Sequence, residues 1–392
     1  MRRVYFASDQ MITSLGFSTE ENIMQVSKGI SGIKTCGDPS ISNNPVAFSA
    51  IDIRRLDAEY DSAAARHLVP SSPFPLTRLE KMFCLSVAGA VRESGVNPGD
   101  PRTIMIFSTT KGNIDQLADK TGTHLNNPRL LLWEMAGFTG RLFNCSHVPY
   151  VVSNACTSGS VAIITAARFI ASGKYDHAIV TGGDVITEFV ISGFQSFQAL
   201  SPTICRPFDA SRDGLSLGEG CGTVVLTCDP ALTGKKRPVS FLGGATSNDA
   251  NHISGPSRDG EGLYLAIAAA MNEAGVNASD TGFISAHGTA TPYNDEMESL
   301  ALHWAGLGQV PVNSFKGYIG HTLGAAGIIE TIFSTWSMRH DILFKSAGYE
   351  TNGVTKPLNV ITENTTTAVK TVLKTASGFG GCNAALVIGN RE

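Results

Sequence analysis

A cysteine at the junction of two sequence patterns is the first candidate for chemistry. Cys156 lies in VVSNACTSGSVAIITAARFIASG (residues 151–173), after a β-branched apolar segment and before small residues and a helix-like pattern. One interpretation is a small side chain buried in the core. The other is a nucleophile, because the N-terminus of a helix lowers the pKa of a thiol and favours the thiolate without an adjacent base.

Two histidines lie in glycine-rich segments of the second half. His287 is in SAHGTATPYNDEMES, at the end of a predicted strand, and His321 is in NSFKGYIGHTLGAAGIIE, just before a predicted helix. The other histidines are interpreted as ordinary polar residues, with His252 undecided. One thiol and two imidazoles could also bind zinc, but the sequence has no short-spaced ligand pair such as CxxC or HExxH. We therefore expect no metal.

Internal repeats indicate which elements position these residues. Three pairs of segments recur in the same order: VRESGVN (91–97) with MNEAGVN (271–277), VPYVVSNACTSG (148–159) with VPVNSFKGYIGHTLG (310–324), and EGCGTVVLT (219–227) with GGCNAALVI (380–388). A short apolar strand follows each member of the first pair, at 103–108 and 282–287. The repetition predicts a duplicated α/β unit, joined near 243–250, with mostly parallel buried sheets and helices on their outer faces.

The duplication also predicts where the candidate residues lie. Cys156 and His321 should occupy pseudo-equivalent turns, each at the start of the third helix of its half, and form one site at the strand C-terminal ends. The segment 112–147 has no counterpart in the second half. We interpret it as an insertion that packs on the core, lines a substrate tunnel or forms a subunit interface.

The bulk composition excludes several classes of protein. The 392 residues carry a net charge of −4, whereas a nucleic-acid-binding protein is normally basic. No apolar run approaches the length of a membrane span, and Asp9 and Gln10 interrupt any signal-peptide core in MRRVYFASDQ. The eight cysteines are scattered, which favours free thiols in a reducing cytoplasm.

Five blocks of the sequence carry a resemblance that covers nearly the whole chain. They are NACTSG around Cys156, CRPFDASRDGLSLGEG (205–220), HGTATPYND (287–295), KGYIGHTLGAAG (316–327) and GFGGCNAAL (378–386). In this order and spacing they resemble the β-ketoacyl-acyl carrier protein synthases of the Cys-His-His class, in the thiolase-like superfamily. The resemblance implies a thiolase-like α/β fold whose duplicated halves, 1–245 and 246–392, form α-β-α-β-α layers. It also implies an acyltransferase that forms carbon–carbon bonds by decarboxylative condensation, without a cofactor.

The resemblance assigns roles to individual residues. Cys156 would hold the acyl chain as a thioester, and neutral His287 and His321 would donate hydrogen bonds to the enolate left when a malonyl thioester loses carbon dioxide. The remaining roles are an oxyanion hole from the backbone N–H groups of Cys156 and Phe379, support of His321 by Lys316 and Glu330, and phosphopantetheine contacts from Thr289 and Thr291. Asp295 and Glu298 are expected to organise the loop and helix after His287.

Several positions depart from the family pattern. Thr109, Thr110 and Lys111 replace smaller residues near the expected acyl pocket, and Ser377 stands where a gating phenylalanine is common. Two pathways therefore remain open. One is fatty acid elongation. The other is a specialised polyketide or aryl-polyene type of pathway, in which this chain would be the working subunit beside a chain-length partner.

Other classes of protein are disfavoured. A degradative thiolase would use a second cysteine, for which Cys382 is a candidate, but HGTAT and KGYIGH point to two histidines. An initiating synthase of the Cys-His-Asn type is disfavoured by His321, and a scaffold by the intact set of reactive residues. The expected partners are an acidic acyl carrier protein and a second, identical or homologous subunit. Arg78 and Lys81 are candidates for docking the carrier.

Overall fold

Two sets of five strands follow the same order in the computed structural model, which describes residues 2–37, 45–118, 127–234, 237–250 and 255–390. The first set is ordered β1-β8-β6-β4-β5 and the second β9-β15-β14-β10-β11. The first comprises β1 (Val4–Thr13), β8 (Gly220–Thr227), β6 (His177–Asp184), β4 (Thr103–Ser108) and β5 (Tyr150–Val152). The second comprises β9 (Ser240–Asn248), β15 (Cys382–Gly389), β14 (Thr371–Gly378), β10 (Phe283–Ser285) and β11 (Val312–Asn313). The duplication predicted from the repeats is confirmed.

The prediction of mostly parallel sheets is wrong. In each set the outer three strands pair in parallel, whereas β8 and β15 pair antiparallel with both neighbours. The reason is clearest in the second set, where a tight turn at 379–381 makes β14 and β15 a hairpin. Strands β1 and β9 also pair antiparallel, so the two sets join edge to edge. The segment 243–250 predicted as the join lies largely inside β9, and the domain boundary at 245 stays a prediction.

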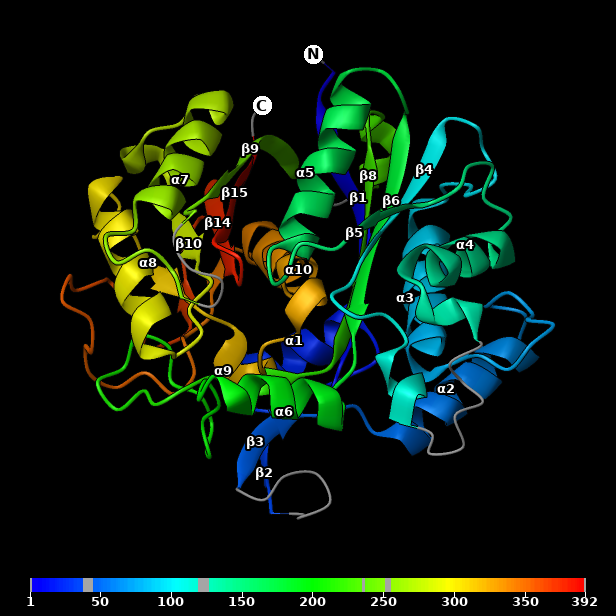
Figure 1. Ribbon diagram of the computed structural model, residues 1–392. Coiled ribbons are helices and arrows are strands. Elements are labelled where there is room, and N and C mark those ends of the chain that lie inside the picture. Colours follow the sequence, from blue (N-terminus) through cyan, green and yellow to red (C-terminus); the bar gives the residue numbers. More distant parts are fainter. Residues whose placement is uncertain (1, 38–44, 119–126, 235–236, 251–254, 391–392) are drawn as a thin grey trace.

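Helices α5 (Ser158–Ala171) and α10 (Ala326–His340) form the layer between the two sets of strands, as Figure 1 shows. Both helices contact strands of both sets. Outer layers are formed by α3 (Arg78–Ser94) and α4 (Leu132–Leu142) on one side and by α7 (Glu261–Ala274) and α8 (Pro292–Trp304) on the other. The remaining helices are α1 (Thr19–Ser27), α2 (Ile53–Ala65), α6 (Glu188–Ser196) and the single turn α9 (Lys316–Ile319). Short strands β2 (Lys34–Cys36), β3 (Val46–Ser49) and β7 (Leu217–Gly218) form a small sheet, and β12 (Ile342–Leu343) pairs with β13 (Thr365–Thr366).

Two glycines let the central helices approach each other closely. A Cβ atom on Gly159 would lie 2.9 Å from the backbone nitrogen of Ile328, and one on Gly327 would lie 2.3 Å from that of Ser160. Only glycine fits at such a crossing. The first turns of α5 and α10 are therefore held together, which brings the segments preceding them to one place.

Cys156 precedes α5 and His321 precedes α10, as predicted, but neither helix is the third of its half by count. Helices α1 and α2, together with the one-turn α9, were not anticipated. Within the insertion, residues 119–126 lie outside the described residues. Helix α4 buries Met135, Ala136 and Phe138 against the core, and no described residue of 112–147 lines either cavity discussed below.

Candidate active site

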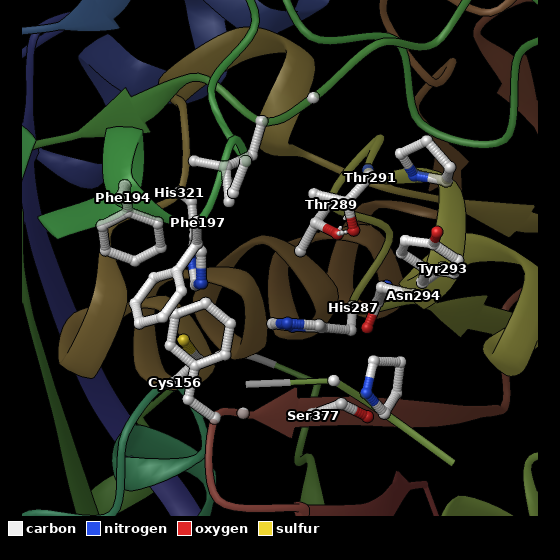
Figure 2. Close-up of a pocket in the computed structure, with 18 of the residues that line it drawn as sticks. Cys156, Phe194, Phe197, His287, Thr289, Thr291, Tyr293, Asn294, His321 and Ser377 are labelled. Atoms are coloured by element: carbon white, nitrogen blue, oxygen red, sulfur yellow. Dashed lines mark hydrogen bonds between the residues drawn. The ribbon is translucent and has the colours of Figure 1, made fainter. Parts of the chain in front are cut away.

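A cavity of about 380 Å³ brings Cys156, His287 and His321 together. Figure 2 shows the sulfur atom and both imidazoles arranged around the same space. Thr289, Thr291 and Phe379 line the same cavity. Residues from both halves of the chain thus meet here, as the sequence predicts.

Cys156 lies on a tight turn between β5 and α5. Ala155 before it adopts a left-handed conformation (φ 45°), which is costly for a residue with a Cβ atom and is common at functional turns. Gly378, at the end of β14, packs against this turn, since a Cβ there would lie 3.0 Å from the Cys156 nitrogen. This contact brings the residue after Gly378, Phe379, next to Cys156. Among the described residues, no loop carbonyl or side chain accepts a hydrogen bond from the backbone N–H of Cys156 or of Phe379. Both N–H groups can therefore donate to a negatively charged oxygen of the substrate.

The Cys156 thiol is less acidic than its place before a helix suggested. Burial raises its pKa to about 11, although the charges of Lys316 and Lys111 act in the opposite direction. Desolvation disfavours the thiolate more than the nearby cations favour it. The resting side chain is therefore a thiol, and its proton needs an acceptor when the sulfur reacts.

His287 is held through its backbone by carboxylates of α8. Its N–H donates to Glu298 Oε1 at 2.9 Å, and the next two residues of the loop donate to Glu298 and Asp295. This agrees with the expected role of both acids in organising the loop. The Lys316 ammonium lies 3.5 Å from His287 Nδ1. Because an ammonium group can only donate, Nδ1 must accept and the ring proton lies on Nε2.

His321 is fixed by an extended segment that includes β7. Its N–H donates to the carbonyl of Ser216 at 2.7 Å, and its carbonyl accepts from Gly218 at 3.0 Å. Neither ring nitrogen has a hydrogen-bond partner among the described residues. The ring lies 5.2 Å, centre to centre, from that of His287.

Both imidazoles are neutral at physiological pH. Burial is the main cause that lowers the pKa of His287 and of His321 well below the usual value, and the charge of Lys316 is the second. A neutral imidazole can donate through one ring nitrogen and accept through the other.

Two buried lysines share one glutamate behind the histidines. Glu330, on α10, lies 2.6 Å from Lys316 Nζ and 2.7 Å from Lys374 Nζ. Lys316 also donates to the carbonyl of His287 at 2.5 Å. The lysine thus supports His287 directly, rather than His321 as the resemblance implied.

Lys374 was missed by the sequence analysis. It lies in TVLKTASG (371–378), where a charged residue interrupts an apolar strand, and its ammonium also donates to the carbonyl of Ser285 at 3.3 Å. Burial lowers its pKa, opposed by the charge of Glu330. A lone lysine among buried strand residues was the available signal, since such a charge needs a partner.

Asp184 is a second residue that the sequence analysis missed. This fully buried carboxylate, at the end of β6, accepts from the N–H of Gly324 at 2.7 Å and from the Thr109 hydroxyl at 2.8 Å. It also accepts from the backbone N–H groups of Thr110 and Lys111. Asp184 therefore ties the loop after β4 to the segment that follows His321.

Phe379 lines both the main cavity and a second cavity of about 260 Å³, which Cys156 also lines. Its ring stacks on Phe194 (5.5 Å between ring centres) and meets the edge of Phe197. Ser377 is buried beside the main cavity, where its hydroxyl lies 2.8 Å from Asn383 Oδ1. The position expected to hold a second gating phenylalanine is thus occupied by a small, hydrogen-bonded side chain.

Other candidate residues lie in different settings. Thr289 and Thr291 bond each other through their hydroxyls at 2.9 Å. The Cys382 thiol donates to Asn154 Oδ1 at 2.9 Å and lines neither cavity, which removes the main reason to consider a two-cysteine thiolase. His252 lies outside the described residues.

The two residues proposed to dock a carrier protein are engaged elsewhere. Arg78 pairs with buried Glu219 and its side chain is only 18% exposed, so it presents little charge to a partner. Lys81 lies 2.7 Å from Asp57 Oδ1 and over the ring of Tyr60. Sequence position alone did not show these pairings, because the partner residues are distant in the chain.

The described residues contain no group of three or more histidine, cysteine or acidic side chains arranged to hold a metal ion. They also contain no helix that is long and apolar enough to cross a membrane.

Comparison with known proteins identifies similar chains. Residues 41–229 match the family model of the β-ketoacyl synthase N-terminal domain, and residues 240–350 match that of the C-terminal domain. A protein of Schizosaccharomyces pombe described as a mitochondrial 3-oxoacyl-[acyl-carrier-protein] synthase is 27% identical over 98% of both chains. The 3-oxoacyl-[acyl-carrier-protein] synthase 2 of Rhizobium meliloti is 36% identical, over 60% of this chain and 59% of its own length.

Solved structures with the same fold match over the full length. The structure of the ketosynthase ApeO in complex with its chain length factor ApeC, from Xenorhabdus doucetiae, matches with a TM-score of 0.86 and 26% identity, over 100% of this chain and 98% of that one. The ishigamide ketosynthase/chain length factor matches with a TM-score of 0.88 and 25% identity, over 100% of both chains. The thiolase-like α/β fold expected from the sequence is confirmed.

Proposed function

The chain belongs to the β-ketoacyl synthase family and is an acyltransferase, and from this premise we propose that it elongates fatty acids by condensing a malonyl thioester with an acyl chain held on Cys156. One observation carries the proposal. A single cavity holds a nucleophilic residue and two neutral imidazoles, which is the set that acyl transfer and enolate stabilisation need.

The first step loads the enzyme. The sulfur of Cys156 attacks the carbonyl carbon of an acyl thioester, while the backbone N–H groups of Cys156 and Phe379 hold the developing oxyanion. The carbon–sulfur bond to the carrier breaks, and the carrier thiol leaves with a proton. Because the Cys156 thiol is protonated at rest, we assign the transfer of this proton to His321, whose ring nitrogens have no partner among the described residues.

The second step forms the carbon–carbon bond. A malonyl thioester loses carbon dioxide, and the electrons of the broken bond form an enolate. Its oxygen accepts hydrogen bonds from Nε2–H of His287 and from His321. Burial, together with the charge of Lys316, keeps both imidazoles neutral, and Lys316 also holds His287 in place. The enolate carbon attacks the carbonyl carbon of the acyl group, the bond from that carbon to the Cys156 sulfur breaks, and the released thiolate takes up a proton from solvent. Thr289 and Thr291, which line the same cavity, would bind the phosphopantetheine arm.

Intact mass spectrometry tests this function directly. The protein and a Cys156→Ala variant are exposed to a panel of saturated acyl-carrier thioesters, and carbon dioxide release from malonyl-carrier is measured in parallel. We expect a mass increase from saturated donors in the wild-type protein alone. Absence of Cys156-dependent loading from every donor would refute the mechanism.

A specialised polyketide or polyene pathway is the second candidate function. Two observations favour it: the solved structures that match over the full length include ketosynthase/chain length factor pairs, and Ser377 and Lys111 alter the surroundings of Cys156. Selective loading with polyunsaturated or aryl-primed chains, with saturated chains refused, would assign the protein to such a pathway.

We further propose an acyl carrier protein and a homologous second subunit as partners. One related structure contains an acyl-carrier protein in complex with its ketosynthase. Strand β5 lies at the edge of the sheet, with Tyr150 42% and Val148 82% exposed beside it. An unpaired edge next to apolar side chains suits pairing with a second copy or a homologue. Sedimentation of the purified chain, alone and with a carrier protein, distinguishes these assemblies.

A cytoplasmic location also stays a proposal. The similar proteins of Schizosaccharomyces pombe and Arabidopsis thaliana include mitochondrial and chloroplastic ones. Fractionation of the source cells, with immunodetection of the chain, decides the location.

A further inference from the structure

The second cavity beside Cys156 has an apolar wall that includes one positively charged side chain. Of the residues that line it, Val190, Phe194, Phe197 and Leu323 are apolar, as are Phe189 and Phe379. Thr110 and Lys111 interrupt this wall. Lys111 is the only lining side chain, among the described residues, that carries a formal charge.

The Lys111 ammonium makes few polar contacts with other described residues. It donates to the hydroxyl of Thr110 at 3.1 Å, and no described carboxylate forms an ion pair with it. Asp184 lies nearby and is influenced by its charge, but that carboxylate already accepts hydrogen bonds from the 109–111 loop and from Gly324. The ammonium therefore retains donors for a ligand in the cavity.

An alkyl chain that ends in a methyl group suits this cavity less well than one that ends in a polar group. It would exclude water from the ammonium and offer no acceptor in return, which is unfavourable for a charged group. A carboxylate at the far end of the chain would instead form a charge-assisted hydrogen bond with the ammonium and a second bond with the Thr110 hydroxyl. The chain between the two ends would still lie against the aromatic wall.

We propose that the acyl group transferred to Cys156 carries a carboxylate at the end remote from its thioester, and that Lys111 and Thr110 bind this carboxylate. The inference rests on the ketosynthase function proposed above and specifies its acyl substrate as a short ω-carboxyacyl chain. The chain is short because Cys156 and Lys111 line one cavity of about 260 Å³.

Matched pairs of acyl thioesters test the inference. Hexanoyl is compared with adipoyl and octanoyl with suberoyl, all on the same carrier, and the rate of Cys156 acylation is followed by intact mass spectrometry. We expect the wild-type protein to load the carboxylated member of a pair at least about tenfold faster, the size of effect a single charged hydrogen bond gives. Lys111→Met should reverse this preference, Lys111→Arg should keep much of it, and Thr110→Val should weaken it.

A control variant and a second measurement distinguish carboxylate binding by Lys111 from an effect of Lys111 on the Cys156 thiol. Lys28→Met, at an exposed position, should keep the wild-type preference. The rate of Cys156 alkylation by iodoacetamide is measured against pH for wild-type and Lys111→Met proteins. If Lys111→Met shifts this profile and slows both members of each pair equally, the lysine acts on the thiol and the inference is wrong.

The remaining outcomes are also decisive. Loading of methyl-terminated chains at least as fast as carboxylated ones by the wild-type protein overturns the inference and leaves the ketosynthase function intact. Absence of loading from all four thioesters overturns both.

Discussion

In the first half of the molecule the turn before α5 carries Cys156, whereas in the second half the turn before α10 carries His321. The first turn relies on the backbone: a left-handed Ala155, a close approach by Gly378 and two N–H groups at the nucleophile. The second half relies on buried charges, because Glu330 and its two lysines lie behind the histidines. Equivalent positions of a duplicated fold have thus acquired different chemistry through their surroundings.

The largest expected effect comes from removing the nucleophile. Cys156→Ala should lower condensation by several orders of magnitude, because no acyl-enzyme forms. Decarboxylation of the malonyl thioester should persist, since its hydrogen-bond donors belong to the other half. Rates of product formation and of carbon dioxide release are compared with those of Cys382→Ala, which should behave like wild type. Condensation by Cys156→Ala would contradict the assignment of acyl-enzyme formation to the first half and of decarboxylation to the second.

Removing the carboxylate of Glu330 tests whether the second half depends on its buried charges. Glu330→Gln leaves Lys316 and Lys374 buried without their common partner, which should cost about 3–5 kcal/mol of the free energy of unfolding. Urea denaturation measures this cost. Exposed Glu363→Gln should change it by less than about 0.5 kcal/mol. Equal stabilities for the two variants would mean that the lysines do not depend on Glu330.

Removing one hydrogen-bond donor should have a smaller effect, confined to one step. His287→Ala is expected to slow malonyl decarboxylation by about 10²–10³-fold, equivalent to about 2.7–4 kcal/mol. Acylation of Cys156, which uses the backbone N–H groups, should change much less. His67→Asn, at an exposed position with φ 53°, is the matched control. A similar loss in both steps would place His287 in acyl transfer as well.

The pH dependence of stability tests whether the imidazoles are neutral. The pKa of each is far below 6.5 in the folded protein, so below pH 6.5 the unfolded chain binds protons that the folded chain does not. The free energy of unfolding should therefore fall with acidification, by about 1.4 kcal/mol per pH unit for each histidine. Between pH 6.5 and 5, His321→Gln should show a shallower decline than wild type. Identical slopes would show that His321 titrates normally.

The smallest effect is expected at the hydroxyl pair beside His287. Thr289→Val removes its bond to Thr291 and a proposed contact to the phosphopantetheine arm, at a cost of about 0.5–1.5 kcal/mol. The result should be a higher KM for the malonyl thioester with kcat nearly unchanged, measured by steady-state kinetics. A fall in kcat alone would assign Thr289 to the chemical step.

The sequence was most informative where chemistry depends on a local turn. Cys156 and His287 each follow a strand, and His321 lies shortly before a helix, all in segments rich in small residues. The repeats predicted correctly that the turns carrying Cys156 and His321 are equivalent. Gly95 and Gly275, which end the helices in VRESGVN and MNEAGVN with left-handed conformations, show why these segments recur. Such features depend on a few neighbouring residues and are therefore visible in the sequence.

What depended on contacts between distant segments was decided only by the tertiary structure. The antiparallel placement of β8, the pairing of Lys374 with Glu330, the contact of Lys316 with His287 and the burial of Arg78 against Glu219 all join residues far apart in the chain. The protonation states of Cys156 and the two histidines were also decided by the tertiary structure, because their pKa values are governed by burial among side chains from both halves. The sequence by itself determined which reactive groups are present and on which turns they lie. Their partners, protonation states and shared cavities arose from packing, which brings together residues that no local pattern connects.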